Sequence, residues 1–224
     1  DTVDCDDSDP TVYPGATEFC GDDIDQDCDG NDRICAIQGE MELDGDADIS
    51  IYGGQTGDEL GSSLALGPDL DGDGRAELIV GAPLSNGDNG GFYVVTLAEG
   101  VSTAAIMLPT TGGSSYSVQT VTSDANNSET GRGIQPTGDL DGDGLSDLLV
   151  TAPFALNPEG PYDGTAKAGA SFIYLADGMP DVTSAADGAD MTIYGQTRHG
   201  QSSTAAGTLG DLNGDGFTEF FIGE

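Results

Sequence analysis

Apolar residues along this chain come in short runs that either alternate with polar residues or form continuous β-branched and aromatic stretches. No segment keeps the 3.6-residue period of an amphipathic helix, and this pattern is typical of β-strands. The fold class is therefore predicted to be all-β. The expected strands lie near residues 48–52, 62–66, 77–80, 92–97, 116–121, 131–135, 147–151, 171–175, 190–194, 202–206 and 218–222.

The pattern repeats along the chain. Three similar acidic segments begin at Asp69, Asp139 and Asp211, which are 70 and 72 residues apart, and the tripeptide IYG at residues 51–53 recurs at residues 193–195. The chain is therefore a tandem repeat. Each complete unit offers four strands, which favours the blades of a β-propeller. Residues 99–115, rich in Thr, Gly and Ser, are interpreted as a connection between blades.

The acidic segment of each repeat has one nine-residue pattern: DLDGDGRAE at residues 69–77, DLDGDGLSD at 139–147 and DLNGDGFTE at 211–219. Oxygen-bearing side chains at positions 1, 3, 5 and 9 converge on one hard cation, and glycine at position 6 permits a sharp turn with positive φ. Asp-Gly clusters also occur in ordinary turns, but three matched copies at regular spacing favour a calcium loop.

The expected calcium ligands are four side chains and the position 7 carbonyl of each loop, as in the EF-hand. No Glu stands at position 12 and apolar residues follow at once, so strands rather than helices are expected after the loops. The ligands are Asp69, Asp71, Asp73, Arg75 and Glu77; Asp139, Asp141, Asp143, Leu145 and Asp147; and Asp211, Asn213, Asp215, Phe217 and Glu219.

The first 40 residues differ in composition, with twelve acidic residues by Cys35 and little apolar content. Such a segment needs covalent or metal cross-links to become ordered. All four cysteines lie here, and the pairs Cys5–Cys20 and Cys28–Cys35 are expected because they close local loops, although three pairings exist. Zinc is a poorer alternative, since no Cys-x-x-Cys pair is present. Disulfides indicate an oxidising, secreted setting.

One or two further calcium sites are expected in this segment, with a disordered acidic linker as the alternative. One set is Asp25, Asp27 and Asp29, which repeats positions 1, 3 and 5 of the other loops and is followed by Gly30. The other set is Asp4, Asp6 and Asp9, joined by Glu18.

Two family resemblances follow from these motifs. The run GDLDGDG, followed by an apolar strand and by Gly-Ala-Pro at residues 81–83, resembles the FG-GAP repeat of integrin α-subunit propellers over about residues 41–224. The resemblance implies an extracellular β-propeller used in adhesion or recognition, with calcium in a hairpin loop of each blade. The N-terminal residues are similar to thrombospondin type 3 calcium repeats and to a bacterial surface metal-binding module. Some relatives of that module are associated with copper, but one His and no Trp leave few soft ligands.

The expected domains are an acidic module at residues 1–40 and propeller blades at 41–224. The blades span about residues 41–100, 113–178 and 187–224, the last one incomplete. Closed propellers need 4 to 8 blades. We therefore expect either a longer parent protein or completion of the ring by other chains.

The charge of the chain limits its partners. Five basic and 41 acidic residues give a net charge of −36, which opposes binding to nucleic acid or to anionic membranes. No apolar run approaches 18 residues, so no transmembrane helix is predicted. The expected partners are a protein or glycan ligand at the cell surface, or another copy of the chain.

The sequence thus predicts a secreted or cell-surface, calcium-binding propeller module for adhesion or recognition. A structural subunit that polymerises into a fibre or surface layer is the alternative, and a non-catalytic part of a larger secreted enzyme is the third interpretation. The chain itself is not expected to be an enzyme. Its single histidine, His199, has only Ser202 and Ser203 nearby, and this serine pair is interpreted as the counterpart of Ser62 and Ser63 in the first repeat.

Overall fold

The structure is a computed structural model, and it divides the chain into two compact units, Asp1–Asp48 and Ile49–Glu224. The expected boundary after residue 40 falls outside the described residues. The structure describes residues 5–6, 8–16, 24–26, 28, 49–70, 73–101, 104–108, 112–123, 127–158, 160, 167–176 and 184–223.

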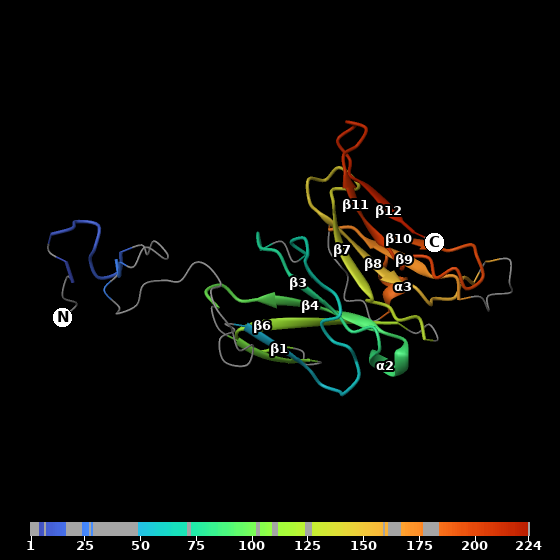
Figure 1. The fold of residues 1–224 in the computed structure, drawn as a ribbon, viewed down its shortest axis with the longest axis horizontal. Helices are drawn as coiled ribbons and strands as arrows, with labels where there is room; N and C mark the ends of the chain where they lie inside the picture. Colours follow the sequence, from blue (N-terminus) through green and yellow to red (C-terminus); the bar gives the residue numbers. More distant parts are fainter. Residues whose placement is uncertain are drawn as a thin grey trace. The chain divides into compact units, whose positions relative to one another are not determined.

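The regular elements of the larger unit are almost all strands (Figure 1). They are β1 (Ile49–Gly53), β2 (Leu64–Leu66), β3 (Leu78–Gly81), β4 (Gly91–Leu97), β5 (Ala104–Leu108), β6 (Tyr116–Thr122), β7 (Gly133–Gly138), β8 (Asp147–Ala152), β9 (Ala170–Tyr174), β10 (Met191–Tyr194), β11 (Ala206–Gly210) and β12 (Glu219–Ile222). Two four-residue segments, α2 (Ser85–Asp88) and α3 (Ala185–Gly188), interrupt them. In α2, Asn86 and Gly87 have φ of 53° and 66°, so this segment is a left-handed turn.

Two antiparallel sheets of four strands form the centre of the unit. Their strand orders are β2-β3-β4-β6 and β7-β8-β9-β10, while β11 pairs with β12, and β1 pairs in parallel with β5. The fourth strand of each sheet therefore comes from the start of the next sequence repeat. The expectation that the four strands of one repeat make one sheet is wrong by one strand. Main-chain pairing to β4 places β6 in the first sheet, and this pairing is not visible in the repeat period.

Two of the expected elements differ from the structure. Strand β5 lies inside the segment that was interpreted as a connection, and its residues Ile106 and Leu108 are 0% and 2% exposed. The strand expected at 202–206 begins only at Ala206. Strand β5 was not predicted because its three large apolar residues lie among many Thr, Gly and Ser residues.

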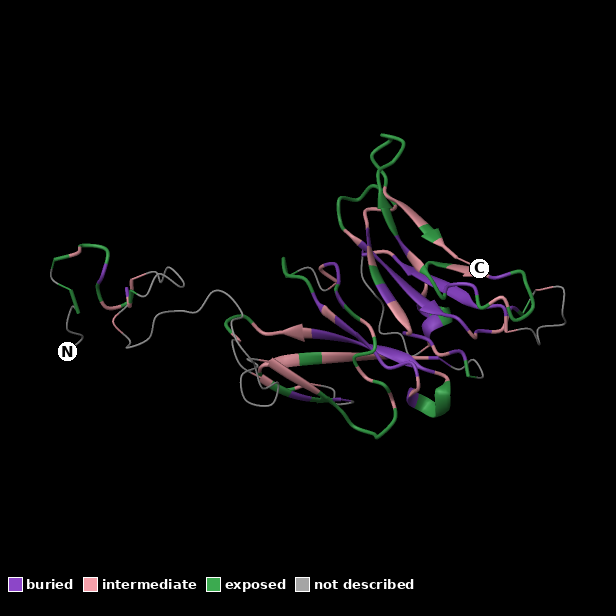
Figure 2. Ribbon diagram, viewed as in Figure 1, coloured by how far each residue is buried: buried purple, intermediate pink, exposed green. Residues whose placement is uncertain are grey.

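The main core lies between the two four-stranded sheets. Ile79, Phe92 and Val121 from the first sheet belong to the same cluster as Val150 and Tyr174 from the second. The rings of Phe92 and Tyr174 meet edge to face, with centroids 5.7 Å apart, a favoured aromatic geometry. Figure 2 shows the buried stretches concentrated in β4, β8 and β9. A second cluster packs the opposite face of the first sheet against β1 and β5.

The innermost strands of successive sheets lie next to each other. Strand β7 packs against β2 on one side and against β11 on the other. This is the arrangement of neighbouring propeller blades. The predicted all-β, partial propeller of four-stranded blades is confirmed.

The described part of the smaller unit is held by one disulfide. Cys5 and Cys28 are bonded, with their Cα atoms 5.7 Å apart. Both expected pairs are therefore wrong, because each used one of these two cysteines; Cys20 and Cys35 lie outside the described residues. The backbone N–H of Tyr13 donates to the carbonyl of Gln26 at 2.8 Å. This hydrogen bond and the disulfide thus bring together segments that are distant in sequence, which local loop closure did not predict.

Candidate metal centre

The three acidic loops occupy equivalent places in the blades. Loop 1 (residues 69–77) joins β2 to β3, loop 2 (139–147) joins β7 to β8, and loop 3 (211–219) joins β11 to β12. Each is the hairpin between the two innermost strands of its sheet. In Figure 1, loops 2 and 3 project from the same end of the neighbouring strands β7 and β11.

A first shared hydrogen bond closes each loop. The carboxylate at position 9 accepts a hydrogen bond from the backbone N–H at position 2, so the end of the loop is tied to its start. The pairs are Leu70 to Glu77 at 2.5 Å, Leu140 to Asp147 at 2.7 Å and Leu212 to Glu219 at 2.6 Å. Sequence reasoning missed this role of position 2, because the donor is a main-chain group; the leucine repeated there was the only signal.

A second shared hydrogen bond fixes the turn. The carboxylate at position 1 accepts from the N–H of the glycine at position 6, at 2.7 Å in loop 1 and at 2.9 Å in loops 2 and 3. These glycines, Gly74, Gly144 and Gly216, have φ of 89°, 90° and 96°. A Cβ atom would meet nothing within 4 Å at any of them. Glycine is therefore needed here for its left-handed backbone and not for space.

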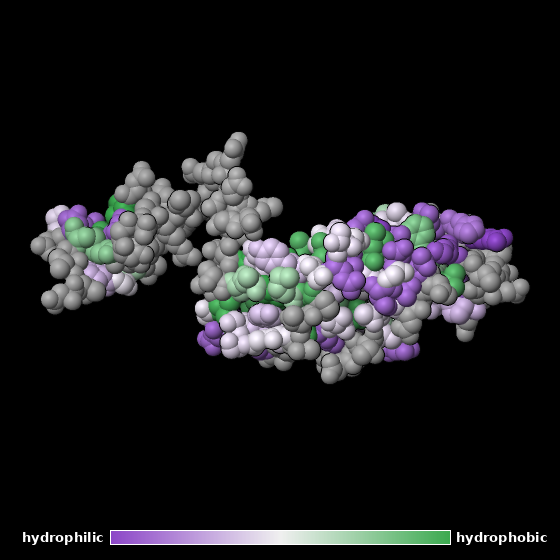
Figure 3. All heavy atoms as spheres, turned by 90° about the horizontal axis from the view of Figure 1, so that it is seen from below, coloured by the Kyte–Doolittle hydropathy of each residue, from purple (hydrophilic) through white to green (hydrophobic). Residues whose placement is uncertain are grey.

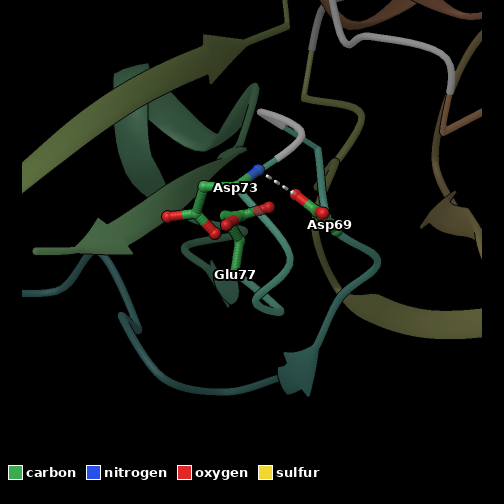
Figure 4. A group of neighbouring side chains, drawn as sticks. All are labelled: Asp69, Asp73 and Glu77. Carbon is green, nitrogen blue, oxygen red and sulfur yellow. Dashed lines mark hydrogen bonds between the residues drawn. The ribbon is translucent and has the colours of Figure 1, made fainter. Parts of the chain in front are cut away.

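The loop carboxylates converge. Three acidic side chains in each loop place one oxygen apiece within 4.8 Å of one another. Because calcium binds oxygen at about 2.4 Å, two ligands of one ion lie at most about 4.8 Å apart. Figure 4 shows the first group, in which the Asp73 and Glu77 carboxylates approach each other and Asp69 accepts from the Asp73 N–H at 3.0 Å. The groups are Asp69, Asp73 and Glu77; Asp139, Asp141 and Asp147; and Asp211, Asp215 and Glu219.

Two of these carboxylates are buried. Glu77 is 1% and Asp147 is 0% exposed. Burial raises the pKa of Asp147, and the nearby charges of Asp141 and Asp143 raise it further. A buried carboxylate among other anions costs free energy unless a cation accompanies it. The Asp147 environment therefore suits a bound cation.

In loops 2 and 3 the pKa of the position 1 carboxylate shifts in the opposite direction. Backbone N–H groups, first that of Gly142, lower the pKa of Asp139, and that of Gly216 lowers the pKa of Asp211. These donors favour the charged form. The main chain thus keeps Asp139 and Asp211 anionic and available to a metal ion.

The three loops are not identical. In loop 1 the Arg75 guanidinium pairs with the carboxylate of Asp73, and its hydrogen bond lowers the pKa of that group. In loop 3 the amide nitrogen of Asn213 donates to Asp215 at 3.0 Å and to Glu219 at 2.9 Å. A half-turn of this amide brings its oxygen to the same place, which a metal ion requires. Loop 2 has neither feature, because Asp141 and Leu145 stand at these positions.

Some expected ligands are not part of the converging groups. Asp71 lies outside the described residues. The Asp143 carboxylate accepts from the N–H of Leu145 at 2.7 Å and is not in the loop 2 group. The position 7 carbonyls of Arg75, Leu145 and Phe217 remain predicted ligands.

In the smaller unit, Asp6 and Asp9 take part in local turns. Their carboxylates accept hydrogen bonds from the N–H and hydroxyl groups of Ser8 and Thr11, and these bonds lower both pKa values. Within the described portion of this unit, no three acidic, cysteine or histidine side chains converge as in the loops. The other predicted ligands are Asp25, which is described, and Asp4, Asp27 and Asp29, which are not.

An acidic hairpin loop in each successive blade defines a class of propeller repeat, and a family model matches this class. Residues 60–95 and 131–174 match the family model of the FG-GAP repeat. The chain thus carries FG-GAP repeats. Residues 4–32 match the Cu-binding MopE family model, which describes a metal-binding motif.

Curated relatives include integrin α subunits of Drosophila melanogaster. Integrin alpha-PS5 is 30% identical over 185 residues, which cover 77% of this chain and 16% of that protein. Integrin alpha-PS2 is 38% identical over 90 residues, or 39% of this chain and 6% of its own length. Integrin alpha-PS3 is 30% identical over 180 residues, which are 76% of this chain and 14% of that subunit. The chain therefore spans about a sixth or less of the relatives it matches.

Among the segments that the structure describes, no helix has the length and apolar character needed to span a membrane.

Proposed function

We propose that this chain is an extracellular or cell-surface module whose propeller loops bind calcium and hold the blades in shape for adhesion or recognition. The observation that carries the proposal is the threefold repetition of one loop geometry: two tying hydrogen bonds, a left-handed glycine and three convergent carboxylates. Calcium prefers oxygen ligands in flexible arrangements. When bound, it supplies the positive charge that a chain with a formal charge of −36 lacks.

The same reasoning extends to the setting and partners. The Cys5–Cys28 disulfide supports a secreted or surface location, and the integrin relatives support a protein or glycan ligand. The N-terminal motif is proposed to bind one or two further calcium ions. A copper-binding role is disfavoured by the single histidine.

The test is calcium binding and thermal unfolding in the same preparation. We expect three sites in the larger unit, and a rise in unfolding free energy of about 2.7 kcal/mol for each site when free calcium is at 100 times Kd. Asp139→Asn should remove one site, whereas Glu99→Gln, an exposed acid outside the loops, should leave the count unchanged. An unfolding midpoint that is the same in calcium and in EGTA would show the proposal to be wrong.

A structural subunit is the second candidate, and one observation favours it. In the part of the chain that the structure describes, Leu64 and Leu66 on β2 and Phe221 on β12 are 58%, 68% and 44% exposed. Apolar side chains exposed on strands favour association with another chain. On the face in Figure 3, however, apolar side chains of the larger unit form small separate groups. Size measurement in calcium and in EGTA discriminates, because a recognition module stays monomeric in calcium and a structural subunit assembles.

The serines near His199 have structural roles. Ser202 and Ser203 are 5% and 1% exposed, and the hydroxyl of Ser203 lies 2.6 Å from that of Ser171. They therefore contribute to packing between β9 and the third blade. The proposal assigns no catalytic role to this region.

A further inference from the structure

Loops 2 and 3 are in direct contact, although their equivalent positions are 72 residues apart in the sequence. The backbone N–H of Thr218 in loop 3 donates to the carbonyl of Asp139 in loop 2 at 2.9 Å. Asp139 is position 1 of its loop, so one residue offers its carboxylate to site 2 and its carbonyl to loop 3.

The donor residue, Thr218, also lies between two proposed calcium ligands of its own loop. Thr218 stands between Phe217, whose carbonyl is the position 7 ligand, and Glu219, whose carboxylate is the position 9 ligand. Movement of the Thr218 N–H therefore displaces ligands on both sides of it. The peptide groups of the two proposed sites share a single hydrogen bond.

Side-chain packing reinforces this contact. A Cβ atom on Gly142 of loop 2 would lie 2.8 Å from Cε1 of Phe217, so the ring rests against the glycine backbone. A Cβ atom on Gly138, just before loop 2, would lie 2.6 Å from the hydroxyl oxygen of Thr218. Both glycines also have positive φ, 88° and 75°. Loop 3 thus packs on loop 2 at Gly142 and on the residue before loop 2, Gly138, and neither position has a side chain.

We propose that calcium binding at loop 2 and calcium binding at loop 3 are positively coupled through the Thr218–Asp139 hydrogen bond and the Phe217–Gly142 contact. The inference rests on the proposed calcium function. An ion that orders one loop fixes the surface against which the other loop must order, so the second ion has less conformational freedom to remove. Coupling of this kind is reciprocal, and its usual size is about 5-fold or more in affinity.

The experiment follows each site separately in the full chain by NMR. The amide signals of Gly144 and Gly216, whose N–H groups bond to Asp139 and Asp211, report loops 2 and 3 during a calcium titration. Asp215→Asn weakens site 3 and keeps an oxygen for the N–H of Phe217, which now bonds to Asp215 at 3.0 Å. We expect the midpoint at Gly144 to rise about 5-fold or more, although no ligand of site 2 has changed.

A second variant tests the contact itself. Phe217→Ala removes the ring but no proposed ligand, and should weaken site 2 by a similar factor. Phe221→Ala is the matched control, because it removes the same kind of ring from the same blade, and Phe221 is 44% exposed and lies outside loop 3; it should leave the Gly144 midpoint unchanged. Retention of the remaining amide spectrum verifies folding.

The outcomes are distinguishable. If Gly144 and Gly216 both respond to calcium but Gly144 keeps its midpoint in Asp215→Asn and in Phe217→Ala, the coupling is wrong and the calcium function stands. If neither glycine responds to calcium in the unaltered chain, the proposed function and the coupling both fail.

Discussion

The backbones of Gly131 and Gly91 approach so closely that a Cβ atom on Gly131 would lie 2.2 Å from the Gly91 carbonyl oxygen. Gly131 leads into the inner strand of the second blade, and Gly91 begins β4 of the first. The carbonyl of Gly131 also accepts from the Ser63 hydroxyl at 2.6 Å. The two blades are thus joined backbone to backbone at a point that excludes any side chain.

Gly131→Ala should therefore destabilise the larger unit by at least about 3 kcal/mol, because a left-handed φ of 87° and a backbone clash act together. Gly57→Ala is the control: its φ is 98°, but nothing lies within 4 Å of its Cβ position. It should cost only about 1–2 kcal/mol. Urea unfolding in saturating calcium measures both, and equal losses would mean that the close approach is not the cause.

Arg75 is expected to compete with calcium for Asp73. The pair is partly exposed, with 44% and 30% of the two side chains accessible, so solvent screens it and its contribution is small. Arg75→Ala should accordingly raise the calcium affinity of loop 1 by about 2- to 5-fold. The Gly74 amide signal reports this site.

Arg132→Ala provides the matched control, since Arg132 also forms ion pairs, with Glu59 and Glu129, but outside the loops. Loop 1 should bind calcium unchanged in that variant. A decrease in affinity on removing Arg75 would show that the guanidinium supports the site and does not compete for it.

Tyr174 should make stability fall in alkaline solution. Its side chain is 0% exposed, its hydroxyl donates to the Ala185 carbonyl at 2.7 Å, and burial raises its pKa. The folded protein therefore keeps this phenol neutral after the unfolded chain begins to ionise near about pH 10. The stabilising contribution is complete below that pH and is lost as the pH rises further.

Tyr174→Phe should cost about 1 kcal/mol near neutral pH through the lost hydrogen bond, and should flatten the alkaline decrease in unfolding free energy. Tyr13→Phe, at a residue of the smaller unit that is 50% exposed, should change neither quantity for the larger unit. Urea denaturation at several pH values measures both effects. An unchanged alkaline slope in Tyr174→Phe would refute the assignment.

The Cys5–Cys28 disulfide gives a direct chemical prediction. Peptide mapping without reduction should recover the two cysteines in one linked fragment. Cys28→Ser should lower the stability of the smaller unit by about 3 kcal/mol, the loop-entropy value for a cross-link over 23 residues. The unfolding midpoint of the larger unit serves as the internal control and should not change.

The sequence predicted well those features that a short stretch of residues determines. The strands that carry apolar runs, such as β3 and β8, lie within a residue of the expected positions. In each loop, three of the acidic side chains that the spacing singled out lie close together, and their role as calcium ligands stays a prediction. These features depend on local alternation and on turn chemistry, which the residue pattern contains.

The features that depend on distant partners were not predicted. The place of β6 in the first sheet and the Cys5–Cys28 pair are set by tertiary packing. The repeat alignment also misassigned a serine. Ser203, with φ of 76°, donates its N–H to the Gly223 carbonyl, just as Gly61 donates to that of Gly81. Ser203 therefore corresponds to Gly61 of the first repeat. The sequence did not reveal this, because a serine in left-handed conformation stands where the first repeat has a glycine.

The offset between repeats and sheets decides how such a chain can be cut or lengthened. Removing one period of sequence takes three strands from one blade and the outer strand from the blade before it, so no single period is a piece that folds alone. Protein engineers who wish to exchange the first blade should cut before β1 and after β6, because β1 pairs with β5 and both pack against the same sheet. A gene duplication that copies the sequence period instead makes every new blade depend on its neighbour for completion.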